Sequence, residues 1–264
     1  MEDMTTSLNG ASGETTSPAI QVSELTKAYV GTLAVKNISF TVDKGTIVGL
    51  LGGNGAGKTT TLSMLLGVLV PTAGEITILG ANMLNERHRA LPRMNFSSPY
   101  VGMPARLTVA ENLSIYANLY GLKNVKTHVH RMAEDLELTD LLKTPLGDLS
   151  AGQKTRASLA KALINDPDIL LLDEPTASLD PDTADWVREY FETFQQRTGA
   201  TILLASHNMG EVERLCHDVL VMKAGVIADQ GSPGSLISRY GRDNLEDVFL
   251  DIARDRDAAL EEVS

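Results

Sequence analysis

The sequence is poor in several features that would otherwise define a class of protein. Its one cysteine, Cys216, excludes an internal disulfide and a cysteine-based zinc site, and we expect that side chain to be reduced and buried. No stretch approaches the roughly 18 consecutive apolar residues of a membrane span. The opening residues, MEDMTTSLNG, do not have the layout of a signal peptide. We therefore expect a chain that neither spans a membrane nor is secreted by that route.

Basic residues are also scarce, with 23 Lys and Arg against 34 Asp and Glu, for a formal net charge of −11. Nucleic-acid-binding surfaces need a basic footprint, so we expect no nucleic-acid partner. Most of the acidic excess lies at the two ends, in residues 1–18 and 243–264. The body of the chain is nearly neutral, and the net charge therefore does not exclude an anionic ligand there.

The front of the chain is predicted to be rich in β-structure, with one helix. Residues 1–18 are mostly Ser, Thr, Gly and Asn, so we expect a mobile tail that cannot offset the entropy cost of ordering. Apolar patterning predicts the elements that follow. They are strands at about 20–25, 35–42, 46–52 and 76–79 and a helix at about 58–69.

The rest of the chain alternates helices with apolar runs. Between about residues 85 and 148, Leu, Met, Ala, Glu and Arg are frequent, and Thr108 with Glu111 forms a capping-box pattern, which predicts a helical insert. The elements after it are a helix at about 151–163 and apolar runs at 169–172 and 202–205. Continuous apolar strands separated by helices are typical of a parallel sheet covered on both faces, so we predict an α/β fold.

Two further helices are predicted in the second half. Asp180 suits the N-cap of one helix, Pro181 suits its first turn and Gly199 suits its end. One face of this helix carries a stripe that we expect to pack against the sheet. The stripe consists of Trp186, Val187, Tyr190, Phe191 and Phe194. The last helix is amphipathic, with an acidic outer face, and its apolar residues are Leu245, Val248, Phe249 and Ile252.

A glycine-rich segment from Gly52 to Thr59 fits the pattern G-x-x-x-x-G-K-[ST] and joins a predicted strand to a predicted helix. Glycines let backbone N–H groups turn inward around an anion, and the helix N-terminus adds positive potential. We expect Lys58 to reach the outer phosphates of a nucleotide and the Thr59 hydroxyl to bind Mg²⁺. This turn lacks the G-x-G-x-x-G of dinucleotide sites. The predicted nucleotide-binding residues of this cradle are Gly52, Gly53, Asn54, Gly55, Ala56, Gly57, Lys58, Thr59 and Thr60.

Three polar residues end the later apolar runs. Asp173 and Glu174 follow the run at 169–172, and His207 follows the run at 201–206. Ligands bind at the carboxyl ends of strands in open α/β sheets, so we expect these side chains to share one site. We predict that Asp173 holds Mg²⁺, that Glu174 polarises the attacking water, and that His207 contacts the γ-phosphate or holds that water with Glu174. The predicted catalytic residues are therefore Glu174, His207 and Lys58.

Together these residues resemble the nucleotide-binding subunit of ATP-binding cassette (ABC) transporters over about residues 19–230. The resemblance rests on five motifs in the order typical of the family. They are the cradle at 52–60, the signature Leu149, Ser150, Ala151, Gly152 and Gln153, the run from Leu170 to Pro175, the D-loop Ser178, Leu179 and Asp180, and the switch histidine His207. Tyr29 matches the aromatic residue that stacks on adenine, an exposed or core tyrosine being the alternative. Residues 244–250 resemble the end of subunits that serve ABC-2-like exporters.

The resemblance implies a P-loop NTPase core whose mostly parallel sheet is covered by helices, with an N-terminal antiparallel β subdomain and an inserted α-helical subdomain at about 85–148. The implied ATPase domain is 19–230, followed by a helical extension at 231–264. The family implies a head-to-tail pair of ATPase subunits, here expected to be a homodimer, with two MgATP between the cradle of one and the signature of the other. Hydrolysis is then expected to drive export through an integral membrane subunit, which holds this cytoplasmic chain at the inner face of the cell membrane.

The sequence departs from the family pattern at two places. The family has a glutamine where the sheet meets the helical insert, but no Gln occurs between residues 21 and 153. In the corresponding stretch at 95–100, Ser97 or Ser98 takes the place of this glutamine through a bridging water, or the contact of the glutamine is absent. We therefore expect weaker or more partner-dependent ATP hydrolysis. Gly53 replaces the usual proline, and we expect this to loosen the loop slightly without abolishing binding. A non-transport ABC-class ATPase and a regulatory module with impaired hydrolysis stay open as alternatives.

Overall fold

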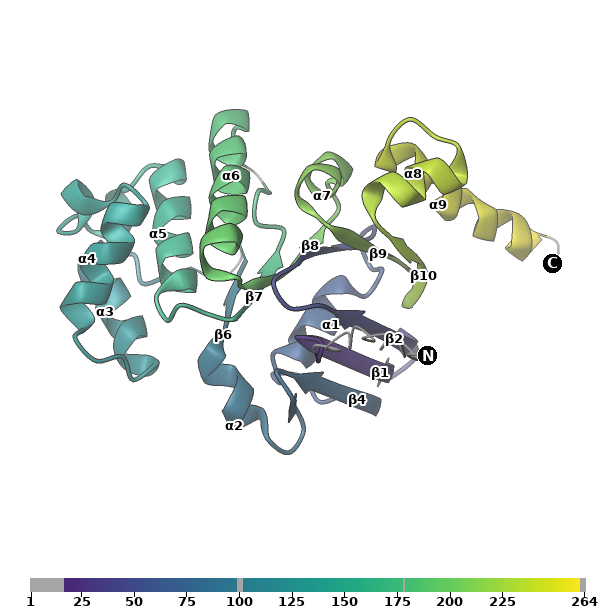
Figure 1. Cartoon of the computed structure of the whole chain (residues 1–264), viewed down its shortest axis with the longest axis horizontal. Helices are drawn as coiled ribbons and strands as arrows, with labels where there is room; N and C mark the ends of the chain where they lie inside the picture. The colour runs from purple at the N-terminus through teal and green to yellow at the C-terminus, as the bar shows by residue number, and fades with distance from the viewer. Residues whose placement is uncertain (1–16, 99–101, 178, 262–264) are drawn as a thin grey trace, which may run out of the picture.

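The computed structural model describes residues 17–98, 102–177 and 179–261, so the tail predicted at 1–18 lies almost wholly outside the described residues. Two β-sheets lie at the centre, with one group of helices at one end of the molecule and the C-terminal helices at the other (Figure 1). The predicted α/β class is correct, and the strands divide between the two sheets as their apolar patterns require.

The N-terminal sheet is antiparallel, in the order β2-β1-β4-β5. Its strands are β1 (Ile20–Tyr29), β2 (Thr32–Val42), β4 (Ala73–Ile78) and β5 (Ala81–Asn82). β1 and β2 extend beyond the predicted residues 20–25 and 35–42, because a tight turn lets the hairpin pair as far as Tyr29 and Thr32. The hairpin end is largely exposed, so it has no apolar pattern that would predict it.

The central sheet has six strands in the order β10-β9-β3-β8-β7-β6. They are β3 (Ile47–Leu51), β6 (Met94–Ser97), β7 (Ile169–Asp173), β8 (Thr201–Ser206), β9 (Asp218–Lys223) and β10 (Val226–Gly231). All neighbours pair in parallel except β9 and β10. β3, β7 and β8 are buried along their whole length, which explains why each reads as an unbroken apolar run.

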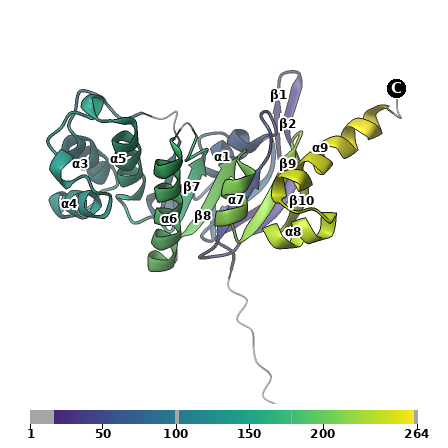
Figure 2. The same cartoon turned by 90° about the horizontal axis from the view of Figure 1, so that it is seen from above.

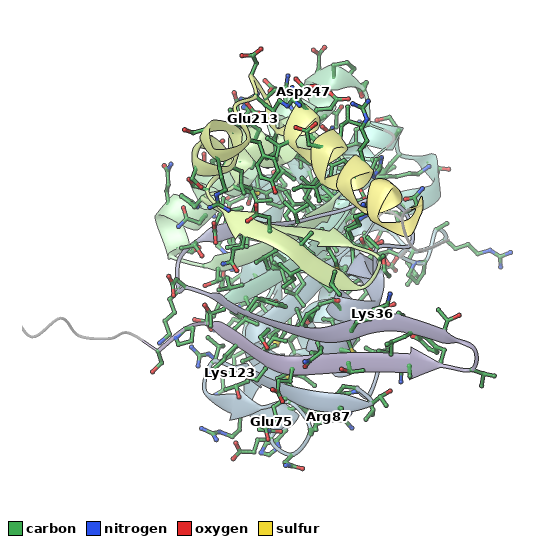
Figure 3. All side chains as sticks on the ribbon, turned by 90° about the vertical axis from the view of Figure 1, so that its right-hand side faces the viewer. Lys36, Glu75, Arg87, Lys123, Glu213 and Asp247 are labelled. Atoms are coloured by element: carbon green, nitrogen blue, oxygen red, sulfur yellow. The ribbon has the colours of Figure 1, made fainter. Side chains whose placement is uncertain are left out.

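The central sheet separates two hydrophobic clusters. On β3, Ile47 and Leu51 face one cluster, whereas Val48 and Leu50 face the other. The first cluster includes α6 (Pro181–Thr198) and α7 (Met209–Leu215), which lie side by side on the same face of the sheet in Figures 1 and 2. The second cluster fills the space between the central sheet, α1 (Lys58–Leu65) and the antiparallel sheet, where Figure 3 shows closely packed side chains.

The ends of α6 and α1 follow local signals. Asp180 caps α6 by accepting a hydrogen bond from the backbone N–H of Thr183 at 3.0 Å, and Gly199 ends it at φ 68°. In the predicted stripe of α6, the buried members are Val187, Phe191 and Phe194, and Trp186 stacks on Tyr190 at its edge. α1 ends at Leu65, four residues before the predicted end, because Gly67 takes a left-handed φ of 65°.

The helical insert begins later than predicted. Its main helices are α3 (Val109–Leu119), α4 (Val125–Asp135) and α5 (Ala151–Leu163), with the capping box of Thr108 and Glu111 at the start of α3. The predicted range 85–148 also contains the short α2 (Arg87–Ala90) and β6, and β6 belongs to the central sheet beside β7. β6 was missed because it is short and its buried Asn95 and Ser97 are polar. The amide of Asn95 donates to Asn165 Oδ1 at 2.8 Å, which satisfies it inside the protein.

The C-terminal part forms α8 (Pro233–Tyr240) and α9 (Leu245–Glu261), which lie beyond β10 in Figure 1. Leu245, Val248 and Ile252 of α9 are buried, as predicted. Cys216 is also buried, and this burial raises the pKa of its thiol. Within the part of the chain that the structure describes, no helix has both the length and the apolar character needed to cross a membrane.

Candidate functional site

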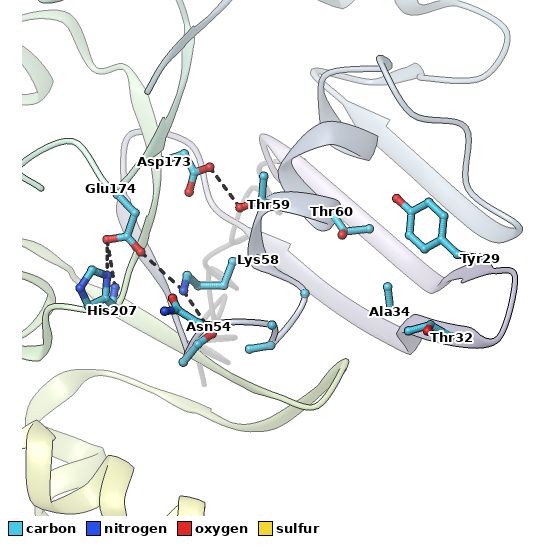
Figure 4. Close-up of a pocket in the computed structure, with 14 residues that line it drawn as sticks. Tyr29, Thr32, Ala34, Asn54, Lys58, Thr59, Thr60, Asp173, Glu174 and His207 are labelled. Carbon is cyan, nitrogen blue, oxygen red and sulfur yellow. Dashed lines mark hydrogen bonds and ion pairs between the residues drawn. The ribbon is translucent and has the colours of Figure 1, made fainter. Parts of the chain in front are cut away.

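A cavity of about 660 Å³ opens where β3, β7 and β8 end at the same edge of the central sheet (Figure 4). It brings together most of the residues that the sequence predicts to bind phosphate, metal and water. The lining residues are Tyr29, Thr32, Ala34, Gly53, Asn54, Gly55, Ala56, Gly57, Lys58, Thr59, Thr60, Asp173, Glu174 and His207. The predicted residue Gly52 lies just outside this lining, and its carbonyl accepts a hydrogen bond from Lys58 Nζ at 2.6 Å.

The cradle depends on glycine at two positions for steric reasons. A Cβ at Gly57 would lie 2.8 Å from the carbonyl oxygen of Ala34, and a Cβ at Gly52 would lie 2.5 Å from that of Met222. Gly57 also has a φ of 107°, which side-chain-bearing residues rarely adopt. α1 begins directly after Gly57, so the positive end of its dipole faces the cavity. The result is an anion-binding loop of the kind that phosphate groups require.

Glu174 connects the cradle to the end of β8. Its Oε1 lies 3.5 Å from Lys58 Nζ, and its Oε2 lies 2.7 Å from His207 Nδ1 (Figure 4). The backbone N–H of Glu174 donates to the carbonyl of Ala205 at 2.8 Å, which extends the pairing of β7 and β8 by one residue. Glu174 has a left-handed φ of 53°, which is uncommon for a residue with a side chain. The local backbone therefore turns this carboxylate toward the cavity.

Asp173 lies one residue earlier and is paired with α1. The Thr59 hydroxyl donates to Asp173 Oδ2 at 3.2 Å. Burial raises the pKa of the Asp173 carboxyl, because the side chain is 5% exposed, and the nearby charge of Glu174 raises it further. The hydrogen bond from Thr59 and the charge of Lys58 act in the opposite direction. Thr59 and Asp173 therefore place a hydroxyl oxygen and a partly desolvated carboxylate at the edge of the cavity.

The opposite wall of the cavity comes from the β1–β2 hairpin. Tyr29 is 48% exposed there, and Lys27 Nζ lies 5.3 Å from the centre of its ring. Thr32 and Ala34 of β2 also line this wall, although the sequence analysis did not select them. They carry no motif, and only the antiparallel pairing of β1 with β2 brings them beside Tyr29. An exposed aromatic ring at this wall provides a flat surface for stacking.

A protein-family model described as "ABC transporter" matches residues 35–177, which is more than half of the chain. This chain belongs to the ABC transporter family. Nod factor export ATP-binding protein I of Rhizobium johnstonii is 38% identical over 232 residues, covering 87% of this chain and 74% of the relative. The protein of the same name from Burkholderia pseudomallei is 40% identical over 230 residues, covering 86% and 75%. The chain is therefore an ATP-binding subunit of an ABC transporter, and it hydrolyses ATP.

Solved structures of ABC transporter subunits share the fold. CbiO1 from Clostridium perfringens, described as part of the transporter complex CbiONQ, is 28% identical with a TM-score of 0.74, covering 84% of this chain and 91% of that one. A structure described as the ATP-binding subunit of an ABC transporter has a TM-score of 0.78 at 24% identity, covering 89% and 99%. These likenesses confirm the P-loop NTPase core with its antiparallel and helical additions.

The predicted signature residues do not line the cavity of their own chain. Leu149 and Ser150 precede α5, where Ser150 and Gln153 form a reciprocal capping box, and Ala151 and Gly152 make its first turn. Of the predicted D-loop residues, Leu179 and Asp180 lead into α6, and Ser178 lies outside the described residues. A helix start with backbone N–H groups and a serine hydroxyl has the features of a second anion-binding surface.

A buried lysine lies next to the segment where the family has a glutamine. Ser97 and Ser98 are each 6% exposed and neither lines the cavity, while positions 99 and 100 lie outside the described residues. Lys161 of α5 is buried here and donates from Nζ to the carbonyl of Phe96 at 3.0 Å. Burial lowers the pKa of its ammonium. Lys161 was not predicted as a buried residue, because its only signal is a lysine on the apolar side of a predicted helix.

The other departure, Gly53, lies next to α9. A Cβ at Gly53 would lie 3.9 Å from the ring of Phe249, and Lys223 Nζ donates to the carbonyl of Ile252 at 2.8 Å. A second cavity of about 290 Å³ separates this outer side of the cradle from α9. The C-terminal segment that resembles exporter subunits is therefore a direct neighbour of the phosphate-binding loop.

Proposed function

We propose that the cavity binds MgATP and that Glu174 activates the water that attacks the γ-phosphate. The observation that carries this proposal is the position of the Glu174 carboxylate between Lys58 Nζ and His207 Nδ1, on the wall of the cavity that holds the cradle. A carboxylate at that point is placed to accept a proton from a water beside the terminal phosphate. The reaction requires these side chains to be held in the right positions relative to the water and the γ-phosphate.

The proposed step divides the work among three side chains. Glu174 takes a proton from water as the water oxygen bonds to the γ-phosphorus, and the bond from that phosphorus to the leaving oxygen of ADP breaks. Lys58 and the N–H groups of the cradle stabilise the negative charge on the phosphoryl oxygens. His207 holds the Glu174 carboxylate and its side chain is half-exposed, so it can also reach the γ-phosphate.

The residues present fit a magnesium ion. The Thr59 hydroxyl and the Asp173 carboxylate are oxygen donors within hydrogen-bond distance of each other, and Mg²⁺ prefers one or two such protein ligands together with phosphate oxygens. A bound Mg²⁺ would neutralise phosphate charge. Thr59 and Asp173 would hold the Mg²⁺, and the positive charge of the ion would offset the cost of burying the Asp173 carboxylate.

We further propose a head-to-tail homodimer that closes around two ATP molecules. Of the predicted signature residues, Ser150 and Ala151 are exposed and Leu149 is buried, and none of the five lines the cavity of its own chain, which supports a role toward the nucleotide of a second copy. A complementation experiment tests this. Mixing the inactive variants Lys58→Met and Gly152→Asp should restore activity, because each mixed dimer contains one site with neither substitution. Mixtures without activity would contradict the arrangement.

Finally, we propose that this subunit drives export through a separately encoded integral membrane subunit and lies at the cytoplasmic face of the membrane. The relatives described above are named for export, and they cover most of this chain. ATP-dependent closure of the dimer would move the membrane partner. Purification of the tagged chain from membranes should bring down one stoichiometric integral membrane protein. ATP-dependent transport by the pair in vesicles would then give the direction.

The binding step has the most direct test. Calorimetric titration of the purified chain with ATP in the presence of magnesium should give saturable binding with one site per chain. The same titration with the Lys58→Met variant is the control, because it removes the cation of the cradle and leaves the fold intact. A folded sample with no affinity for MgATP would overturn the proposed function.

A further inference from the structure

A buried carboxylate lies behind the site and outside every motif described above. Glu211, in the first turn of α7, is 2% exposed. Thr176 Oγ1 donates to its Oε1 at 2.7 Å, and Ser206 Oγ donates to its Oε2 at 2.8 Å. Both oxygens of this carboxylate therefore bind hydroxyl groups from other segments of the chain.

Those two segments carry the proposed hydrolytic residues. Ser206 is the last residue of β8 and directly precedes His207. Thr176 follows Glu174 by two residues, and its carbonyl accepts a hydrogen bond from the backbone N–H of Leu179, in the predicted D-loop. Glu211 is therefore a physical link between the end of β8 and the loop that follows β7.

Helix capping does not explain the orientation of Glu211. Glutamate at the third position of a helix commonly turns back to accept a hydrogen bond from the N-cap N–H. Here the N-cap is Asn208, whose N–H donates instead to Ser206 Oγ at 3.0 Å, while Asn208 Oδ1 accepts from the N–H of Glu211. The Glu211 side chain is thus free of the capping box and reaches into the protein toward two hydroxyl groups.

Burying this carboxylate is costly. Desolvation raises the pKa of Glu211, and the charge of Glu174 raises it further, whereas the hydrogen bonds from Thr176 and Ser206 and the charge of Arg188 lower it. Packing alone does not require a carboxylate, since an apolar side chain of similar size would avoid the desolvation cost. The two hydroxyl contacts are therefore the part of the arrangement that needs a functional explanation.

Ser206 has one hydroxyl proton and two carboxylates within reach. Its Oγ lies 2.8 Å from Glu211 Oε2 and 3.5 Å from Glu174 Oε2. The shorter of the two is the hydrogen bond that Ser206 donates to Glu211. Donation to Glu211 leaves Glu174 Oε2 to His207, whose Nδ1 lies 2.7 Å away.

We propose that Glu211 is a positioning residue for ATP hydrolysis, which holds Ser206 and Thr176 so that His207 and Glu174 keep their relative placement. This inference rests on the roles proposed above for Glu174 and His207. Glu211 itself touches neither nucleotide nor water in this scheme. Substitution of Glu211 should therefore lower ATP turnover without a matching loss of nucleotide binding.

The test measures kcat, KM and ATP affinity for single and double variants of the full chain in the assembled transporter. Glu211→Ala should lower kcat by about 10- to 100-fold, the effect of a small misplacement of catalytic groups. Its KM and ATP affinity should stay within about threefold, because the interaction acts on the transition state. Glu211→Gln should recover part of the loss, since its amide oxygen can accept from one hydroxyl and its amide nitrogen can donate to the other.

Thr176→Val and Ser206→Ala each remove one contact and keep the carboxylate. Each substitution should lower kcat. When either is combined with Glu211→Ala, it should lower kcat much less than it does alone, because the interaction is already broken. Thr201→Val is the matched control. Thr201 lies at the opposite end of β8, is 2% exposed, and its hydroxyl oxygen accepts a hydrogen bond from Gly45 N at 3.0 Å. It should lower Tm to a similar extent and leave kcat unchanged.

Three results would overturn the inference. These are a normal kcat in all the Glu211, Thr176 and Ser206 variants, additive losses in the double variants, or losses of kcat that follow Tm for Thr201→Val as well. If Glu211→Ala does not fold, the Thr176 and Ser206 variants decide the question by the same criteria. The Glu174→Gln variant separates the two proposals, because normal turnover by that variant rejects the proposed function whatever Glu211 does.

Discussion

Four neighbouring parallel strands, in the order β3, β8, β7 and β6, end at one edge of the central sheet, but they end differently. β3 leads into the glycine-rich cradle, β7 into Asp173 and Glu174, and β8 into His207. β6 ends in buried, uncharged serines that do not line the cavity. Three strand ends thus converge on one site, whereas the fourth faces the helical insert. The residues proposed to act on ATP therefore lie apart from the place where the family has a glutamine.

The largest expected effect concerns the end of β7. Glu174→Gln should lower ATP turnover by about 10²- to 10⁴-fold, because the amide cannot accept the proton of the attacking water. Binding of ATP and dimer formation should persist, since the side chain keeps its size. Phosphate release measures turnover, titration calorimetry measures ATP binding, and light scattering measures dimer formation. Glu75→Gln, at an exposed position on β4, is the control. Near-normal turnover by Glu174→Gln would contradict the role assigned to that strand end.

The next effect concerns the end of β3. Lys58→Met should weaken ATP binding by about 10- to 100-fold, which corresponds to a charge-assisted hydrogen bond of about 1.5–3 kcal/mol. Titration calorimetry with and without magnesium measures the affinity. Lys44→Met removes an exposed lysine that does not line the cavity and should leave the affinity unchanged. Equal affinities for both variants would mean that Lys58 does not contact phosphate.

A smaller effect is expected at the end of β6, where the comparison can be broken directly. Introducing Gln at Ser98 and at Pro99 in separate variants should raise the ATPase rate of the assembled transporter in at least one of them. We expect an increase of about two- to tenfold, the equivalent of one hydrogen bond of about 0.5–1.5 kcal/mol. Unchanged rates in both variants, with unchanged Tm, would show that the missing glutamine does not limit hydrolysis.

The smallest effect is on stability and concerns Asp173. Because burial raises the pKa of this carboxyl above its usual 3.8, the folded chain favours the protonated form, and the charged form destabilises it once the pH exceeds the raised pKa. Asp173→Asn removes that charge, so without nucleotide and magnesium Tm should rise by about 1–3 °C at pH 8. This rise in Tm should disappear as the pH falls below the usual pKa range of carboxyl groups. A lower Tm at both pH values would contradict this account.

Elements with strong local signals were predicted well from the sequence. α5 begins and ends where predicted, and Asp180 and Gly199 mark the two ends of α6. β3, β7 and β8 were recognised because each is buried on both faces, so burial alone produces an unbroken apolar run. The cradle was proposed from its glycine spacing, and the close approach of Gly57 to Ala34 shows why that position needs glycine.

Elements whose stability depends on distant partners were not predicted. β6 is short and half polar, and its place in the sheet depends on the pairing with β7 and on the bond of Asn95 to Asn165. Lys161 and Glu211 lie on helices where a charged residue would ordinarily be read as exposed. Each is buried because a carbonyl or hydroxyl from another segment satisfies it.

The sequence by itself determined the chemistry of this protein, because the cradle, the acidic strand end and the order of the motifs depend on local residue types and spacing. The tertiary structure alone decided how those groups meet. Parallel pairing carries the ends of β3, β7 and β8 to one edge and leaves β6 beside the helical insert. It also places Glu211 between Thr176 and Ser206, which are 30 residues apart in the chain. Such contacts depend on three-dimensional packing, which has no local sequence signal.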